Sequence, residues 1–503
     1  MIKKEIYEQV LVENNELKTL LQRKEERIAY LERLLYGAKR DKLAQQGPTL
    51  FDELFEKALD EKQSTLEEVA KDVDKEATSR REKRKKEPSR PAKYRYVGLP
   101  EEWREEYPEG INLADYDIIG ANEDRILHRT EARVWVECIK RPILRLKSEK
   151  NALQTNIIQA PSPRPIIGGN HVAADFLARL ILDKYVYHIP EYRQVKIYSD
   201  LGVKLPTSTI NNWVHAVANK LYPLYETLCE EILHSGYLQI DEVPWRIADR
   251  IGQSCRKGYA WQFRDVDIGG KGTFFYYHKG SRAGEIPRSQ LKRFKGTIQT
   301  DGYAVYNYFE SQSDVTLLGC MAHVRRKFIE AQKTHPQEAA QAVKYISLLY
   351  TIEENLKHRN ASLEEIQIER QEKALVIMDA MESWMKVVSL RCLPDDLFGK
   401  ALDYAYKLWP RLKRYTLDGR YQIDNNAVER GHRASVLGRK NYLFSQSDKG
   451  AEDNALFYSL MESCEAVGVN KLQWLTYVLN KLHKDSSDEE IISMLPHNYK
   501  KSE

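Results

Sequence analysis

The chain has 503 residues, of which 42% are hydrophobic and 30% charged, with a formal net charge of +4. This length is enough for several domains, and the composition is typical of a folded globular chain rather than a disordered one. No apolar run approaches membrane-spanning length and the N-terminus lacks an apolar signal core, so we expect a cytoplasmic protein. The six cysteines include no Cys-x-x-Cys pair, which argues against a disulfide framework and a cysteine zinc site.

Residues 1–38 predict a coiled coil that resembles a leucine zipper. Two rows of residues recur every seven positions and are offset by three and four, as the a and d positions of a heptad repeat require. The rows are Tyr7, Asn14, Leu21, Ile28 and Leu35, and Val10, Leu17, Lys24 and Leu31. Lys24 departs from the pattern, and a helix that packs on its own chain is the alternative. We expect a homo-oligomer formed through this segment.

Two segments of irregular pattern follow. Residues 39–96 predict a charged linker whose basic end, SRREKRKKEPSRPAKYRY, is typical of a solvated segment with unspecific attraction to DNA. Residues 97–165 predict a small mixed module, in which EARVWVECIKRPILRL alternates like a pair of strands.

Residues 166–233 have a helical pattern. A helix, a turn at Gly202 and a second helix capped near Thr207 are typical of a helix-turn-helix. A helical hairpin that only packs has the same pattern. If the segment binds DNA, the residues facing the groove are Ser208, Thr209, Asn211 and Asn212.

The pattern changes after residue 233. Three strand-like segments, YLQI, YAWQFRDV and GTFFYYHKG, precede a helix and two further strands, GTIQT and DVTLLGC. Three antiparallel strands followed by strand–helix alternation predict a ribonuclease H-like arrangement. We therefore expect a multidomain α+β protein with a ribonuclease H-like catalytic domain at 234–334 and 416–450. A helical insertion at 335–415 interrupts this domain, and a helical region at 451–503 follows it.

Three acidic residues occupy informative places in this arrangement. Asp241 is expected at the end of the first strand and Asp301 at the end of the fourth, which lies beside the first. Glu429 is expected on the helix after the insertion. Carboxylates suit Mg²⁺ or Mn²⁺, and two such ions about 4 Å apart catalyse phosphodiester cleavage. We predict that these three residues bind two ions and are catalytic.

Each acid also has a simpler explanation when taken singly. Asp241 could cap a turn before Pro244, Asp301 precedes a glycine in a turn, and Glu429 could pair with Arg433 four residues later. The joint placement of the acids favours the metal site.

Basic residues surround the third acid, and we expect them to hold DNA phosphates beside the metal ions. They are Arg430, Arg433, Arg439 and Lys440. Cys320 and His323 form a Cys-x-x-His pair ahead of Arg325 and Arg326, which are further candidates for phosphate contact. A packed cysteine and a hydrogen-bonded histidine at a helix start are the alternative for this pair.

The chain resembles the IS66 family of bacterial insertion-sequence transposases, a DDE family, over most of its length. The segments that carry the resemblance are LERLLYGAKRDKL, YLQIDEVPW, IQTDGYAVYN, GCMAHVRRKF and GRYQIDNNAVERGHRASVLGRKNYLFSQSDKGAEDNALFYSLMESC. The resemblance implies Asp241, Asp301 and Glu429 as the triad, an insertion before the third acid, and a helix-turn-helix. Similar Cys-x-x-His pairs follow the second aspartate in several DDE families, which makes Cys320 and His323 accessory residues.

One feature departs from the family pattern. Family members usually carry a cysteine-rich zinc module before the helix-turn-helix, whereas residues 97–165 contain only Cys138. We therefore expect no zinc.

The activity implied by the resemblance is cleavage and joining of double-stranded DNA at element ends and target sites. The protein would work in the bacterial cytoplasm, on the nucleoid when bound to DNA, with proteins encoded by the same element as candidate accessory partners. A catalytically inactive or repurposed DNA-binding protein and a structure-selective nuclease on the same fold are the alternatives. Metal-dependent nicking and strand-transfer products would separate the three functions.

Overall fold

The structure is a computed structural model that describes residues 69–73, 134–139, 143–145, 157–159, 161–168 and 172–500, except 249–253, 281, 283 and 391. The predicted coiled coil, almost all of the linker and most of the module at 97–165 lie outside the described residues. Among the described residues, no helix is both long and apolar enough to cross a membrane.

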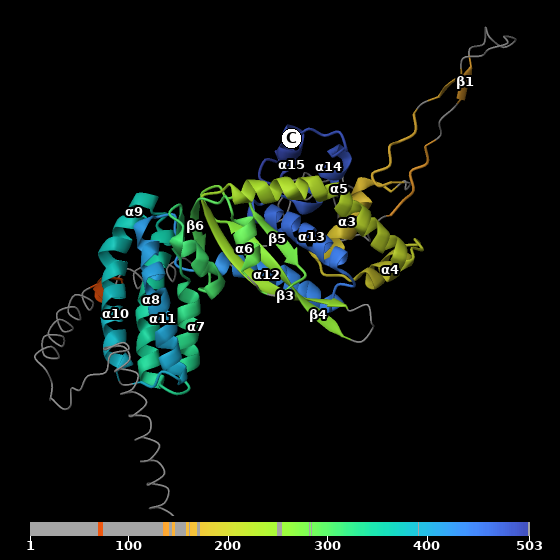
Figure 1. Cartoon of the computed structure of the whole chain (residues 1–503). Coiled ribbons are helices and arrows are strands. Elements are labelled where there is room, and N and C mark those ends of the chain that lie inside the picture. The colour runs from red at the N-terminus through yellow and green to blue at the C-terminus, as the bar shows by residue number, and fades with distance from the viewer. Residues whose placement is uncertain are drawn as a thin grey trace, which may run out of the picture.

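A mixed sheet of five strands forms the centre of the described chain (Figure 1). Its strands are β3 (Tyr237–Ala248), β4 (Cys255–Asp265), β5 (Thr273–His278), β6 (Gly296–Gln299) and β7 (Val315–Leu318). The order across the sheet is β5-β4-β3-β6-β7, in which β3, β4 and β5 are antiparallel and β3, β6 and β7 are parallel. The predicted strand succession, with the fourth strand of the sheet beside the first, is confirmed.

The first strand of the sheet is longer than the sequence indicated. Asp241 was expected at its end, but β3 pairs with β4 from Leu238 to Ala248, so that Asp241 lies inside the strand. Pro244 does not end β3, because on this edge β6 pairs with β3 only as far as Gln239 and the next bridge joins Ile247 to Ser445, so that no strand pairs with Pro244 there.

Three helices precede the sheet: α3 (Ala174–Tyr185), α4 (Glu191–Asp200) and α5 (Thr207–Leu233). The chain turns between α4 and α5 at Gly202, whose φ of 86° favours glycine. The two predicted helices are therefore present. The second helix begins at Thr207, where a capped start was predicted; Pro206 occupies the N-cap position and no side chain caps the helix.

Four helices make up the C-terminal part of the described chain. Helices α12 (Asn426–Tyr442) and α13 (Asp448–Ala466) pack on the sheet, α12 against β3 and β4 and α13 against β5. Helices α14 (Lys471–Lys481) and α15 (Asp488–Met494) pack against α3 and α5 respectively. One large apolar core joins the sheet to α3, α5, α13 and α14. Two short helices, α6 (Glu285–Gln290) and the 3-10 helix η3 (Ala304–Ser311), connect β5, β6 and β7.

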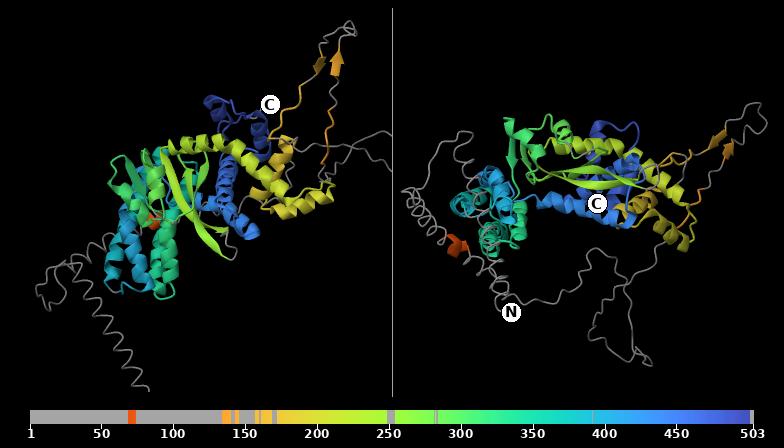
Figure 2. Two further views of the ribbon diagram at one scale, coloured as in Figure 1. Left: turned by 45° about the vertical axis from the view of Figure 1, so that its right-hand side comes forward. Right: turned by 60° about the horizontal axis from the view of Figure 1, so that its bottom comes forward.

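The segment between β7 and α12 forms a helical bundle at one end of the sheet, away from α3 and α4 (Figures 1 and 2). It consists of α7 (Met321–Ala331), α8 (Pro336–His358), α9 (Leu363–Glu369), the π-helical turn η4 (Arg370–Ala374), α10 (Leu375–Ser389), α11 (Leu397–Lys413) and the 3-10 turn η5 (Arg414–Leu417). The bundle has its own apolar core. The helical pattern predicted across 335–415 is present.

A small antiparallel pair, β1 (Ile143–Arg145) and β2 (Ile157–Gln159), lies ahead of α3. The sequence predicted a strand pair within EARVWVECIKRPILRL, but residues 134–139 are not a strand and 143–145 pair with 157–159 instead. The alternating pattern identifies extended residues and does not identify their partner, which explains the error.

Candidate active site

The register of two parallel strands relates the two predicted aspartates. Gln239 of β3 lies opposite Gln299 of β6, and its Nε2 donates to Gln299 Oε1 at 2.9 Å. Two residues further along each segment are Asp241 and Asp301. Because side chains alternate along an extended chain, Asp241 lies on the sheet face of the glutamine pair. Asp301 follows β6 in a turn, where its carboxylate accepts the backbone N–H of Tyr303 at 2.9 Å.

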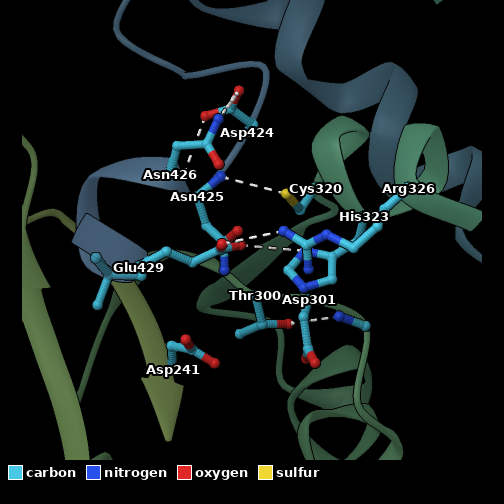
Figure 3. Close-up of polar contacts among 12 residues, drawn as sticks. Asp241, Thr300, Asp301, Cys320, His323, Arg326, Asp424, Asn425, Asn426 and Glu429 are labelled. Atoms are coloured by element: carbon cyan, nitrogen blue, oxygen red, sulfur yellow. Dashed lines mark hydrogen bonds and ion pairs between the residues drawn. The ribbon is translucent and has the colours of Figure 1, made fainter. Parts of the chain in front are cut away.

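The same glutamine fixes the start of α12. Gln239 Nε2 donates to the carbonyl oxygen of Asp424 at 2.9 Å, and its Oε1 accepts the backbone N–H of Val428 at 3.2 Å. Glu429 follows directly, in the first turn of α12. Figure 3 shows the side chains of Asp241, Asp301 and Glu429 arranged around one region, each arriving from a different segment.

Glu429 interacts with α7. Its Oε2 accepts a hydrogen bond from Arg326 at 3.2 Å, and its Oε1 lies 3.5 Å from His323 Nδ1 (Figure 3). Among the described residues, these two are its ion-pair partners, so the alternative pairing with Arg433 is not found. Glu429 Oε1 is buried and accepts no hydrogen bond from any described residue.

Cys320 is a buried residue at the N-cap of α7. Its Sγ accepts the backbone N–H of Asn425 at 3.4 Å, and burial raises the pKa of the thiol to about 12. One ligand atom from each of Cys320, His323 and Glu429 lies within 4.8 Å of the other two. The neutral, hydrogen-bonded thiol is well suited to joining the start of α7 to the start of α12.

Sequence reasoning missed Glu242, which is 8% exposed. It pairs with Arg282 and accepts the hydroxyl of Tyr306 at 3.1 Å. Burial, and then the negative charges of Asp241 and Asp301, raise the pKa of Glu242 to about 7, while Arg282 opposes the rise. Arg282 also lies 3.9 Å from Asp301, so one guanidinium links the buried carboxylate to the site. No sequence pattern marks Glu242. In the segment YLQIDEVPW, the neighbouring Asp241 is the residue that matches the first acid of the triad.

His432 was also missed. It is 7% exposed, and its Nε2 lies 3.3 Å from Asp241 Oδ2. Neither ring nitrogen is hydrogen-bonded to a described residue. The signal that could have identified it is spacing: it follows Glu429 by three residues, which places both on one face of the helix.

The cations predicted to contact DNA have different environments. Arg430, Arg433 and Lys440 are exposed on α12. Arg439 donates from its guanidinium to the carbonyl of Pro244 at 2.7 Å and so ties α12 to β3. Arg325 is exposed on α7, beside Arg326.

The predicted helix-turn-helix residues lie at the start of α5, which packs against α4 on the side of the sheet away from the helical bundle (Figure 1). Ser208 and Asn212 are exposed and Thr209 is half-buried. Asn211 donates to the carboxylate of Glu191 on α4 at 3.2 Å, so its amide is already engaged between the helices.

Asp241, Asp301 and Glu429 match a hard divalent cation in the chemistry of their donor atoms, whereas the ligand atoms that already lie within 4.8 Å of one another are those of Cys320, His323 and Glu429. All three residues offer carboxylate oxygens, which Mg²⁺ and Mn²⁺ prefer. A buried carboxylate oxygen that lacks a hydrogen bond, such as Glu429 Oε1, is costly unless another ligand satisfies it. A cation bound by the three acids would do so.

Comparisons with known proteins agree with this architecture. The model of the transposase IS66 family matches residues 169–453, and that of the IS66 C-terminal element matches residues 459–497. The uncharacterized protein y4jD of Sinorhizobium fredii is 28% identical over 500 residues, which cover 94% of each chain. The uncharacterized protein y4qI of the same organism is 24% identical over 482 residues, which cover 93% of this chain and 87% of the relative.

The mixed α+β fold and these matches define the class of the protein, which is that of the transposases. The chain belongs to the IS66 transposase family.

Proposed function

We propose that this protein cleaves DNA at the ends of an insertion sequence and joins the resulting ends to target DNA, with Asp241, Asp301 and Glu429 as metal ligands. The observation that carries the proposal is the role of Gln239, which pairs with Gln299 and also holds the start of α12. The three acids therefore come from segments that are hydrogen-bonded to one another. The strand order supports a ribonuclease H-like domain at 234–334 and 416–450, split by the insertion at 335–415.

Two Mg²⁺ or Mn²⁺ ions bound by these acids would activate the attacking oxygen and stabilise the leaving oxygen of a phosphodiester. Arg326 holds one oxygen of Glu429, and His432 lies beside Asp241, so both residues orient ligands. Water is the attacking group in strand hydrolysis, and a 3′-hydroxyl is the attacking group in joining. Both reactions are phosphoryl transfers, so one set of carboxylates serves both.

DNA would reach this site through two surfaces. The start of α5 would read element ends as part of a helix-turn-helix, with the exposed Ser208 and Asn212 toward the bases. The exposed Arg430, Arg433 and Lys440 of α12 would contact phosphates. The heptad repeat at residues 1–38 would pair two chains so that two DNA ends are held together.

Substitution of each acid tests the proposal. Asp241→Asn, Asp301→Asn and Glu429→Gln should each abolish Mg²⁺-dependent cleavage and joining of DNA carrying the sequences that flank the gene. Binding of the same DNA should persist, because each variant loses a metal ligand and no docking surface. Asp314→Asn is the matched control, since Asp314 is an exposed carboxylate paired with Lys295.

Substantial metal-dependent activity in any of the three variants would show that the replaced acid is not an essential metal ligand. Incubation with DNA that already carries a free 3′ end separates the proposed function from a nuclease. A transposase joins this end to a second duplex, whereas a nuclease yields only shorter strands.

A further inference from the structure

Helices α7 and α8 border an open cavity of about 450 Å³, and its lining residue Arg326 pairs with Glu429. Its lining comprises Ala322, Arg325, Arg326 and Ile329 of α7, and Ser347 and Tyr350 of α8. On α7 the adjacent Arg325 and Arg326 each lie three or four residues from Ala322 and from Ile329, and on α8 Ser347 lies three residues from Tyr350, so each helix presents one face to the cavity. Asn426 closes the end nearest to α12.

The cationic groups of this cavity have unused hydrogen-bonding capacity. Arg325 makes no hydrogen bond or ion pair with any residue that the structure describes. Arg326 uses one nitrogen for Glu429, and its side chain is 52% exposed. A guanidinium has five N–H donors, so most of those of both arginines are open to a ligand.

The carboxylate of Asp424, which contacts the lining residues Tyr350 and Asn426, already accepts hydrogen bonds. Asp424 Oδ2 accepts the Tyr350 hydroxyl and the Asn426 side-chain amide, each at 2.7 Å. Its Oδ1 accepts the backbone N–H of Asn426 at 3.0 Å. Burial and the Asp424 charge raise the pKa of Tyr350 well above its ordinary value, so the hydroxyl keeps its proton and this bond. The free donors of the cavity therefore favour an anionic ligand.

We propose that this cavity receives one unpaired nucleotide of the DNA strand next to the phosphate that is cut. The inference rests on the proposed function and names a subsite for its substrate. Guanidinium groups bind phosphate and stack on bases, and Ile329 and the Tyr350 ring supply apolar and aromatic contact. The volume lies within the range of small-molecule sites and cannot admit a duplex. The bond between Arg326 and Glu429 relates the occupant to one of the three acids.

Binding of two DNA probes by the full-length protein tests the subsite. One probe is a fully paired duplex, and the other is the same duplex with one unpaired 2-aminopurine nucleotide at its 3′ end. Both are measured by fluorescence anisotropy in EDTA. We expect about tenfold tighter binding of the second probe, because stacking of one base contributes at this level. The 2-aminopurine emission should change on binding.

Ser347→Trp fills the cavity and should remove the preference for the unpaired probe without changing binding of the paired one. Ala340→Trp is the matched control, because Ala340 is an exposed residue two turns earlier on α8 and outside the cavity lining. It should keep the preference. If circular dichroism shows that Ser347→Trp does not fold, Arg325→Gln is measured in its place and should also remove the preference for the unpaired probe. Arg325 is exposed and has no described internal partner, so this variant should fold.

The proposal is overturned if the wild-type protein binds both probes equally, or if the preference survives in a folded Ser347→Trp or in Arg325→Gln. It is also overturned if free deoxyadenosine monophosphate binds as tightly as the unpaired probe, because the site would then serve a free nucleotide. No metal is present, so these results do not depend on whether Asp241, Asp301 and Glu429 catalyse cleavage. The acid variants can fail while the subsite stands, and the reverse is also true.

Discussion

The imidazole Nε2 of His432 lies 3.3 Å from Oδ2 of Asp241, so a buried side chain of α12 contacts the proposed metal ligand of β3. Residues that orient a metal ligand typically change metal affinity or activity by about 10–100-fold when they are replaced. We predict that His432→Gln raises the Mn²⁺ concentration needed for half-maximal cleavage by about that factor and leaves DNA affinity unchanged. A titration of cleavage rate against Mn²⁺ measures the effect.

The control for this prediction is His234→Gln, at an exposed position at the end of α5. It should leave the Mn²⁺ dependence unchanged. An identical Mn²⁺ dependence in His432→Gln and the wild-type protein would show that His432 only fills space against Phe275, with which its ring makes an edge contact at 5.8 Å.

Gly431 allows α12 to lie close to the sheet. A Cβ at this position would collide with the side-chain amide of Gln262, which is buried in β4. We predict that Gly431→Ala destabilises the protein by about 1–3 kcal/mol and lowers cleavage, because the displaced helix carries Glu429 with it. Thermal unfolding and a cleavage assay measure the two effects.

A second substitution makes this prediction specific. Gly431→Ala combined with Gln262→Ala should recover part of the activity, because the smaller residue makes room for the new methyl group. Gly450→Ala is the control, since a Cβ there would meet only Ser447 Oγ at 3.4 Å. Full stability of Gly431→Ala would contradict the proposed close approach.

Arg433 and Arg439 should behave differently, although both belong to the basic group of α12. Arg433 is exposed and does not pair with Glu429, so its proposed partner is a DNA phosphate. Arg433→Gln should lower the slope of log affinity against log salt by about one and leave the melting temperature unchanged. Arg439→Gln should instead cost about 1 kcal/mol of stability, because it loses the hydrogen bond to Pro244.

DNA binding across a salt series and thermal unfolding of both variants separate these roles. Unchanged affinity, salt slope and turnover in Arg433→Gln would show that this part of α12 is only a solvated surface.

Glu462 of α13 gives a pH dependence of stability away from the acids. Burial raises its pKa from 4.5 to about 7, and the neighbouring Glu465 adds to the rise. The folded state therefore holds this proton more tightly than the unfolded state, and stability falls as the pH rises from about 4.5 through 7. Glu462→Gln should have little effect at pH 4.5 and should stabilise the protein at pH 8, by up to about 3 kcal/mol.

Glu465→Gln is the control of opposite sign. The hydrogen bond from Lys471 lowers the pKa of Glu465, so its contribution to stability is present above the unfolded value and is lost as the pH falls. Glu465 is 70% exposed, so solvent screens this pair and we expect a small loss at pH 8. Melting temperatures of both variants at pH 4.5 and pH 8 provide the measurement. Equal melting temperatures of Glu462→Gln and wild type at pH 8 would contradict the assignment.

The order of strands and helices could be predicted because residue patterns with periods of two and about 3.6 are local properties. The contacts made by the side chains of the candidate site could not be predicted in this way. The continuation of β3 beyond Asp241 depends on its pairing with β4, and Glu429 turns to Arg326 rather than Arg433 because α7 packs beside the start of α12. The burial of Glu242 against Tyr306 likewise depends on contacts between segments that are far apart in the sequence.

The segment from Ile423 to Val428 connects the core of the helical bundle to the sheet. Ile423 belongs to the core of the helical bundle, and its carbonyl accepts the backbone N–H of Met321, whereas Val428 is bound by Gln239 of the sheet. Glu429 is therefore anchored on both sides of this junction. Opening of the bundle alone, a local unfolding event, would remove the contacts of Glu429 with Arg326 and His323 of α7, while the hydrogen bond of Val428 to Gln239 would keep the start of α12 on the sheet. The order of folding would then matter, because a chain whose bundle has not yet folded would keep all three acids on the sheet but would lack the two side chains that orient Glu429.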